Sequence, residues 1–127
     1  MFHKNRELTE EERKWNLMWE MWVQGEADSP YAELMEYDGE VNNGGHSQYF
    51  FNLANCEHLD ADVKTILEIL PNPLHDNLKR GYDAFMAQED ICDDDNEELF
   101  DECDNVFTEH EQILIDILKE YSTRLSL

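Results

Sequence analysis

Residues 97–124 read EELFDECDNVFTEHEQILIDILKEYSTR, and this stretch decides the fold. Its apolar side chains recur at spacings of three and four residues, which is the period of one face of an α-helix. The pattern is held along the whole stretch and predicts one long amphipathic helix. The inward-facing positions are Leu99, Phe100, Cys103, Val106, Phe107, His110, Ile113, Leu114, Ile117, Leu118 and Tyr121.

The opposite face of this predicted helix is acidic, and no Lys or Arg interrupts it before Lys119. Carboxylates one turn apart on a helix stand about 5–6 Å from each other. Such a row roughly imitates the phosphate spacing of a nucleic-acid strand. Like-charge neighbours cost a few tenths of a kcal/mol each, which suggests that the charge is kept for a partner. The face comprises Glu97, Asp101, Asp104, Thr108 and Glu111, with Glu98, Glu102 and Glu109 beside it.

Working outward from this helix, the rest of the chain also has helical periodicity and no alternating strand pattern. Thr9 and Glu12 form a capping box for a first helix, and Gly25 is its expected stop. The apolar stripe between them consists of Trp15, Met18, Trp19, Trp22 and Val23. The sequence therefore predicts an all-α protein of about six helices, folded as one domain over residues 1–127.

Turn residues place the boundaries of the middle helices. Ser29 and Pro30 are expected to cap and begin a short helix that ends near Gly39. The pair Gly44-Gly45 opens the next helix, over residues 46–55. Asp60 is expected to cap a helix over residues 61–70. Two prolines, Pro71 and Pro73, then separate it from a helix over residues 74–88.

The net charge restricts the partners of this chain. Its 127 residues include 31 Asp or Glu and only 9 Lys or Arg, for a formal net charge of -22. Such a surface repels nucleic acid and anionic membranes and attracts basic proteins. The alternative is an acidic shell that serves only solubility. Hydrophobic residues make up 41% of the chain, which is enough to fill a core.

Targeting and redox features indicate a cytoplasmic protein. Residues 1–6 hold no apolar signal-peptide region, and no apolar run is long enough to span a membrane. The three cysteines, Cys56, Cys92 and Cys103, show no CxxC spacing, so we expect reduced thiols. Neither a metal site nor a cofactor is expected. The acidic run over residues 90–98 fails as a calcium loop because Glu98 stands where a loop counted from Asp93 needs glycine.

A second segment is the most specific local signal. Residues 40–52 read EVNNGGHSQYFFN. Gln48 and Asn52 stand one helical turn apart on one face, with Glu40 nearby. These side chains, together with Asn43, Gly44 and Gly45, form either a polar network that braces the helix start or a small binding pocket. Amide side chains are poor acid–base groups, so no catalytic residue is assigned.

This segment resembles the NGG-x-x-Q-[YF]-F-x-N signature of the DUF4375 or DMP19-like (DNA-mimic-protein-19-like) family. The match includes the acidic residue at 40, the glycine pair, Gln48, the aromatic pair and Asn52. His46 departs from the pattern, because an aromatic residue such as Phe is expected there. The resemblance implies a helical domain over most of the chain and, through the family name, a DNA mimic.

We therefore expect a non-enzymatic protein that occupies the nucleic-acid-binding surface of a basic partner. That partner is a transcription factor, a nucleoid protein or a nuclease. Two alternatives are an immunity-type inhibitor of a basic nuclease toxin and a small-molecule-binding or enzymatic domain centred on residues 43–52. The sequence leaves open whether the protein is a monomer or a homodimer. The expected contact residues are Asp93, Asp94, Asp95, Glu97, Glu98, Asp101, Glu102 and Asp104.

Overall fold

The computed structural model describes residues 7–88 and 96–127, and these ranges form α-helices and no strand. The all-α prediction is confirmed. The helices number five because α2 merges two that the sequence predicts separately. Their bounds are α1 Glu10–Val23, α2 Tyr31–Asn55, α3 Leu59–Leu67, α4 Leu74–Met86 and α5 Glu97–Thr123.

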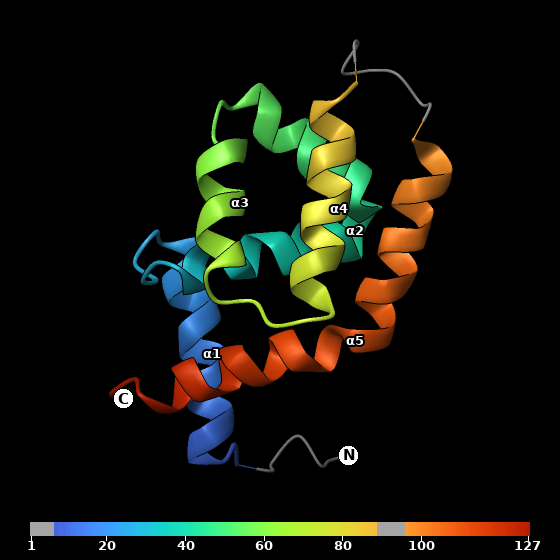
Figure 1. Ribbon diagram of the computed structural model, residues 1–127. Helices are drawn as coiled ribbons and strands as arrows, with labels where there is room; N and C mark the ends of the chain where they lie inside the picture. The colour runs from blue at the N-terminus through green and yellow to red at the C-terminus, as the bar shows by residue number, and fades with distance from the viewer. Residues whose placement is uncertain (1–6, 89–95) are drawn as a thin grey trace, which may run out of the picture.

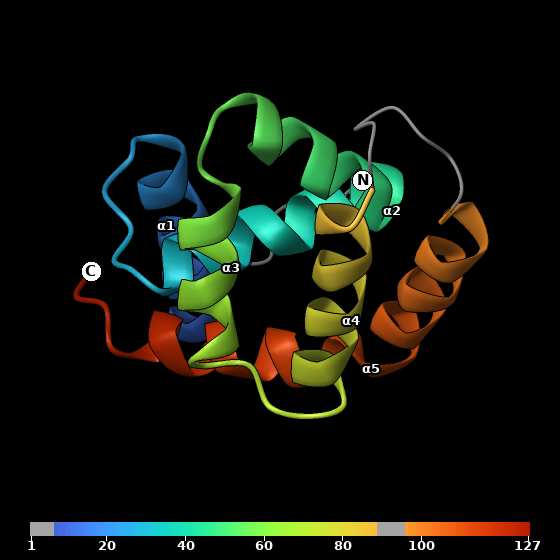
Figure 2. The ribbon, with the colours of Figure 1, turned by 45° about the horizontal axis from the view of Figure 1, so that its top comes forward.

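Two of the five helices change direction within their length. Figure 1 shows α2 running behind α3 and α4 and then turning upward at its kink. It also shows α5 descending beside α4 and then turning beneath the other helices towards α1. The view tilted by 45° shows the same arrangement, with α3 and α4 lying over α2 (Figure 2). The two bent helices therefore form the frame on which α1, α3 and α4 pack.

Aromatic rings fill the space where α2 meets α4 and α5. Tyr37 and Phe50, both fully buried, come from the two halves of α2. The Tyr37 ring meets Phe107 of α5 edge-on, with centroids 5.4 Å apart. The Phe50 ring lies 5.5 Å from Phe85 of α4 and 5.9 Å from Phe100 of α5. Such ring pairs each add about 0.5–1.5 kcal/mol to the gain from buried area.

The first helix follows its sequence signals. The Thr9 hydroxyl accepts the backbone N–H of Glu12 at 3.0 Å, and the Glu12 carboxylate accepts that of Thr9 at 2.8 Å, which confirms the capping box. Gly25 follows the helix with φ +76°, as a glycine stop requires. The indoles of α1 pack edge-on along the helix, with Trp19 centroids 6.2 Å from Trp15 and 5.8 Å from Trp22.

Several predicted boundaries are wrong. The helix that begins after Pro30 does not end at Gly39, because burial of Tyr37 and Val41 on either side outweighs the helix propensity of one glycine. Pro30, not Ser29, is the N-cap, and the Ser29 hydroxyl donates to the Glu33 side chain instead.

The third correction concerns Asp60. The helix α3 begins before it, at Leu59, with His58 as the N-cap residue. The Asp60 carboxylate accepts a hydrogen bond from the Tyr82 hydroxyl of α4 and is therefore used between helices. The helix also ends earlier than predicted, at Leu67, although Leu70 is buried as expected.

Gly45 is the residue at which α2 changes direction. It has φ +80° and ψ +179°, a backbone conformation almost restricted to glycine. A Cβ on Gly45 would also meet the Asp104 carboxylate of α5, 2.5 Å from Oδ2. Glycine is also needed at position 44, because the Gln48 side chain occupies the space that a Cβ would take there. The predicted helix start at this glycine pair is thus confirmed as a kink.

We predict that Gly45→Ala lowers the free energy of unfolding by about 1–3 kcal/mol, since alanine would be strained at this φ and ψ. Gly39→Ala in the same helix is the matched control. No atom lies within 4 Å of a Cβ placed there, so alanine should raise stability by about 0.5–1 kcal/mol. Urea unfolding measures both changes. Equal stability of the two variants would contradict the role assigned to Gly45.

Candidate functional site

The second half of α2 begins at His46, and its N-terminus is capped by a carboxylate from α5. The backbone N–H of His46 donates to Oδ1 of Asp104 at 2.8 Å. The first N–H groups of a helix have no partner within the helix, and its N-terminus favours negative charge. Asp104 therefore satisfies a donor that the kink exposes, and a charge-assisted bond of this kind is stronger than a neutral one.

The imidazole of His46 continues this contact into the core. The side chain is fully buried, with Nδ1 2.6 Å from Oδ1 of Asp104 and Nε2 2.6 Å from the Tyr37 hydroxyl. Burial raises the pKa of Tyr37 well above its usual value, so its hydroxyl stays protonated. A carboxylate can only accept, so the Nδ1–H of His46 donates to Asp104, and the Tyr37 hydroxyl bonds the other ring nitrogen.

The amide side chains expected to share one face do so. The amides of Gln48 and Asn52 donate to the two carboxylate oxygens of Glu40, each at 2.9 Å. The network spans the kink but lies at the surface, since Asn52 is exposed and Gln48 is half-buried. Asn43 is exposed, and the neighbouring Asn42 makes the bonds to other elements. The three side chains of the network thus engage one another, which favours a bracing role.

A carboxyl pair holds α2 to α5 on the other side of the kink. The Asn42 amide donates to the Asp38 carbonyl at 2.9 Å and to the Glu111 carboxylate at 2.8 Å. Asp38 is 7% exposed, and its Oδ1 has no hydrogen-bond partner. Burial, followed by the hydrogen bond and charge of Glu111, raises the pKa of Asp38 to about 7. Asp38 therefore titrates near neutral pH, and its protonated form donates to Glu111.

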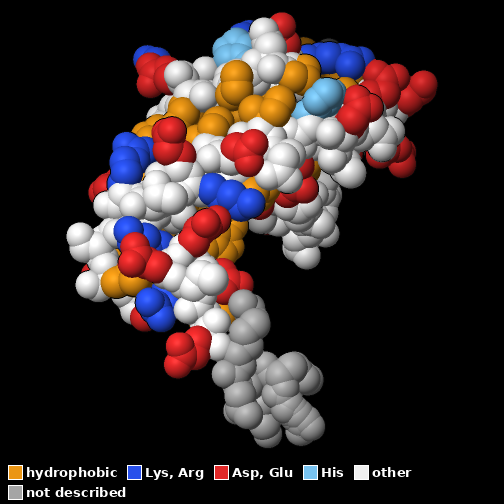
Figure 3. Space-filling model, turned by 90° about the horizontal axis from the view of Figure 1, so that it is seen from below, with side chains coloured by type: hydrophobic (Ala, Val, Ile, Leu, Met, Phe, Trp, Pro, Cys, Tyr) orange, Lys and Arg blue, Asp and Glu red, His pale blue; other side chains and the backbone are white. Residues whose placement is uncertain are grey.

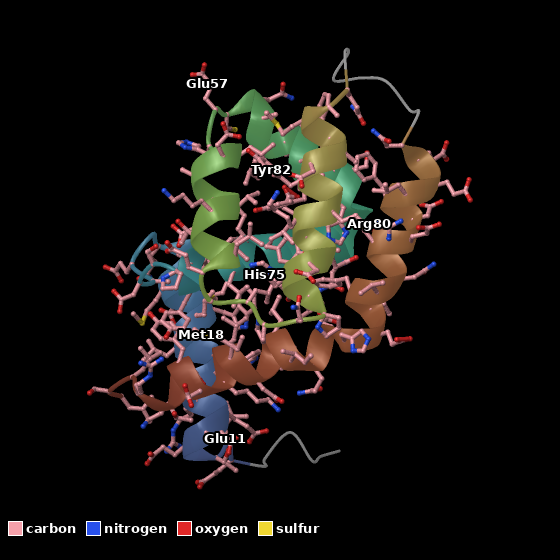
Figure 4. All side chains as sticks on the ribbon, viewed as in Figure 1. Glu11, Met18, Glu57, His75, Arg80 and Tyr82 are labelled. Carbon is pink, nitrogen blue, oxygen red and sulfur yellow. The ribbon has the colours of Figure 1, made fainter. Side chains whose placement is uncertain are left out.

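The acidic residues predicted on α5 divide into two groups. Glu97, Glu98 and Asp101 are exposed and form no ion pair with the described residues. Glu102 is exposed but bonds the Arg80 guanidinium, which reaches from α4 towards α5 (Figure 4). Asp104 was expected to face water, and this is wrong, because it caps the second half of α2. Asp93, Asp94 and Asp95 lie outside the described residues.

The opposite end of the molecule has mixed charge. Figure 3 shows this face from below, with Lys and Arg side chains among the Asp and Glu side chains and apolar groups between them. On α1, Lys14 pairs with Glu10 at 3.5 Å and also donates to the Thr123 carbonyl. Carboxylates that form no ion pair with the described residues, by contrast, stand in the first turns of α5: Glu97, Glu98 and Asp101.

Residues 30–124 match the family model described as DMP19-like protein. The chain belongs to the DMP19-like family. The match includes both halves of α2 and all of α5, so the segment that resembles the family signature lies within it. No curated protein and no solved structure matches the chain significantly.

The described ranges of this DMP19-like chain lack two features. No group of three or more His, Cys, Asp or Glu side chains there is arranged to hold a metal ion. No helix there has both the length and the apolar character needed to cross a membrane. Cys56 is exposed and Cys103 is buried, and neither is in a disulfide.

Sequence reasoning missed the residues that join α2 to α5 in this DMP19-like chain: Tyr37, Asp38, Asn42, His46 and Glu111. His46 is the clearest case. The side chain of the expected Phe would fill the same space, but it could not form the hydrogen bonds that the imidazole forms with Asp104 and Tyr37. In the sequence, only the departure from the family signature at His46 pointed to these bonds, because a buried polar ring needs hydrogen-bond partners.

We predict that Asp104→Ala lowers the free energy of unfolding by about 1–3 kcal/mol, because it leaves two donors of buried His46 without an acceptor. Asp101→Ala, on the same helix and exposed, should change stability by less than about 0.5 kcal/mol. Urea unfolding compares the two variants. Equal losses would show that Asp104 acts only as a surface carboxylate.

We also predict that mild acidification stabilises the protein. The pKa of Asp38 is about 7 when folded and near 3.8 as an ordinary carboxyl. Between these values the folded state holds a proton that the unfolded chain has lost, so stability falls as pH rises through this window. A change of about 1 kcal/mol would place the melting temperature at pH 5.5 about 4 °C above that at pH 8.

Asp38→Asn is the control for this titration. It cannot ionise, so the difference in melting temperature between the two pH values should shrink. Glu36 and Asp62 also have raised pKa values, chiefly through burial, and their remaining contribution has the same sign. A parent protein that is more stable at pH 8 than at pH 5.5 would contradict the assignment.

Proposed function

We propose that this DMP19-like chain is a non-enzymatic binding protein that occupies the nucleic-acid-binding surface of a basic partner. The observation that carries the proposal is the exposed acidic start of α5. Glu97, Glu98 and Asp101 form no ion pair with any residue that the structure describes, and Glu102 pairs with Arg80. A rigid helix holds them about 5–6 Å apart, close to the charge spacing of a nucleic-acid backbone.

The chemistry of such a contact is carboxylate for phosphate. Arg and Lys side chains that bind phosphate also bind carboxylate, and Arg does so with two parallel hydrogen bonds. Both the chain and DNA are strongly negative, so the chain should not bind DNA itself. The partner is therefore a basic DNA-binding protein, and a nuclease in that role would make the chain an immunity-type inhibitor.

A small-molecule or enzymatic role at residues 43–52 has less support. Glu40, Gln48 and Asn52 satisfy one another, so a ligand there would have to displace bonds already made. Asp104 is excluded from the proposed contact set because its Oδ1 caps α2. We propose Glu97, Glu98, Asp101 and Glu102 as the contact residues within the described ranges.

We predict that the double reversal Glu98→Lys with Asp101→Lys abolishes competition with DNA. The basic protein that the immobilised chain retains from its native cells at low salt is purified and loaded with a labelled duplex. Displacement of the duplex is then followed by fluorescence anisotropy. The parent should displace it, and less so as salt rises, because the contacts are ionic.

The matched control is Glu11→Lys with Glu20→Lys on α1. It makes the same change in net charge, and like Glu98 on α5, Glu11 lies in the first turn of its helix. Both residues are exposed, and Figure 4 marks Glu11 near the start of α1. This control should compete nearly as well as the parent. Equal competition by both double variants would exclude α5 as the contact surface.

A further inference from the structure

A second acidic feature lies away from the first turns of α5, beside the loop that joins α1 to α2 (Figures 1 and 2). Here a pocket of about 300 Å³ opens between this loop, the first turns of α2 and α3. Three of its lining side chains are the carboxylates Glu33, Glu36 and Asp62, and a fourth is Trp22. The Trp22 indole N–H donates to the Ala32 carbonyl at 3.1 Å, which fixes the ring.

The three carboxylates have no cation of their own. Within residues 7–88 and 96–127, no Lys, Arg or His forms an ion pair with any of them. The Ser29 hydroxyl donates to Glu33 at 2.8 Å. Glu36 and Asp62 instead bond each other, and burial together with the neighbouring charge of Asp62 raises the pKa of Glu36.

A buried hydroxyl beneath these carboxylates has no partner. Tyr49 is fully buried, and its hydroxyl forms no hydrogen bond with the described residues. Its pKa is raised first by burial and then by the charges of Asp62, Glu36 and Glu33, in that order. The hydroxyl therefore lies within electrostatic range of the carboxylate cluster. Buried hydroxyl groups in native proteins are normally bonded, so this one marks an incomplete arrangement.

We propose that this pocket binds an organic cation, namely a guanidinium or primary ammonium group. The carboxylates from α2 and α3 supply its charge partners, and the fixed Trp22 ring supplies an aromatic surface for it. A metal ion fits less well, since no group of three ligating side chains among the described residues has the arrangement for one. The pocket is independent of the acidic start of α5 and of the partner proposed for it.

Protons should compete with the cation, because burial and the neighbouring carboxylates raise the pKa of Glu36. Other titratable groups nearby are Glu33 and Glu40 on α2 and His58 at the start of α3. Affinity should therefore be lower at pH 6 than at pH 8.

The probe is methylguanidinium, and methylurea is its uncharged counterpart of the same shape. Each is titrated into the full chain while the Trp22 indole signal and the amide signals of α2 and α3 are followed by NMR. We expect methylguanidinium to shift these signals saturably and methylurea to leave them unchanged. Equal effects of the two compounds, or shifts confined to other parts of the chain, would overturn the proposal.

Glu36→Gln and Asp62→Asn should each weaken methylguanidinium binding by about tenfold, the loss of one charge contact. Both variants should fold, because each removes a like-charge neighbour. Glu68→Gln, which also removes one carboxylate but lies outside the pocket, should bind within about twofold of the parent. An equal loss in Glu68→Gln would show that only net charge matters.

A blocked tripeptide with a central arginine distinguishes the two sources of the cation. Tighter binding than methylguanidinium assigns the pocket to a basic side chain of a protein, and weaker binding assigns it to a free small molecule. The double reversal on α5 should retain methylguanidinium binding, and Glu36→Gln should retain competition with DNA. Failure of one proposal would therefore leave the other standing.

Discussion

The bond from the His46 backbone N–H to the Asp104 carboxylate is the contact on which the arrangement of this molecule depends. It lets α2 break its hydrogen-bond ladder at Gly45 and resume in a new direction without an unsatisfied donor. The missing Cβ of Gly45 makes room for the carboxylate, and the buried imidazole anchors it from inside. The new direction of α2 carries Tyr49 and Phe50 into the core.

Acidic residues in this chain therefore have two different uses. Asp104 and Glu111, two turns apart on α5, hold α2 after and before its kink, respectively. Asp38 lies beside Glu111, and Glu36 lies beside Asp62. Burial raises the pKa of Asp38 and of Glu36. Glu97, Glu98 and Asp101 form no ion pair with the described residues. Part of the acid in this chain thus serves internal contacts, and part faces water.

Local signals in the sequence were reliable where a short stretch of chain decides the outcome. The apolar period of residues 97–124, the capping box at Thr9 and the break at Gly44-Gly45 all appear in the structure. Asp104 was misplaced because a helical period gives the angle of a side chain about its own helix but not which neighbours surround that helix. Its partner His46 lies 58 residues away in the chain. The family resemblance, based on a short motif, was confirmed over residues 30–124.

The bonds that join α2 to α5 on both sides of the kink have a consequence for the proposed mimicry of nucleic acid. Many proteins bend DNA as they bind it and recover the deformation energy through added contacts. In this chain Asp104 and Glu111 fix α5 against α2 on both sides of Gly45, so the carboxylates at the start of α5 are held at a set angle. In the function proposed here, a decoy built in this way would offer an acidic surface that cannot be bent. It would select partners whose binding groove matches its shape from the outset, and discriminate against those that recognise DNA by its flexibility.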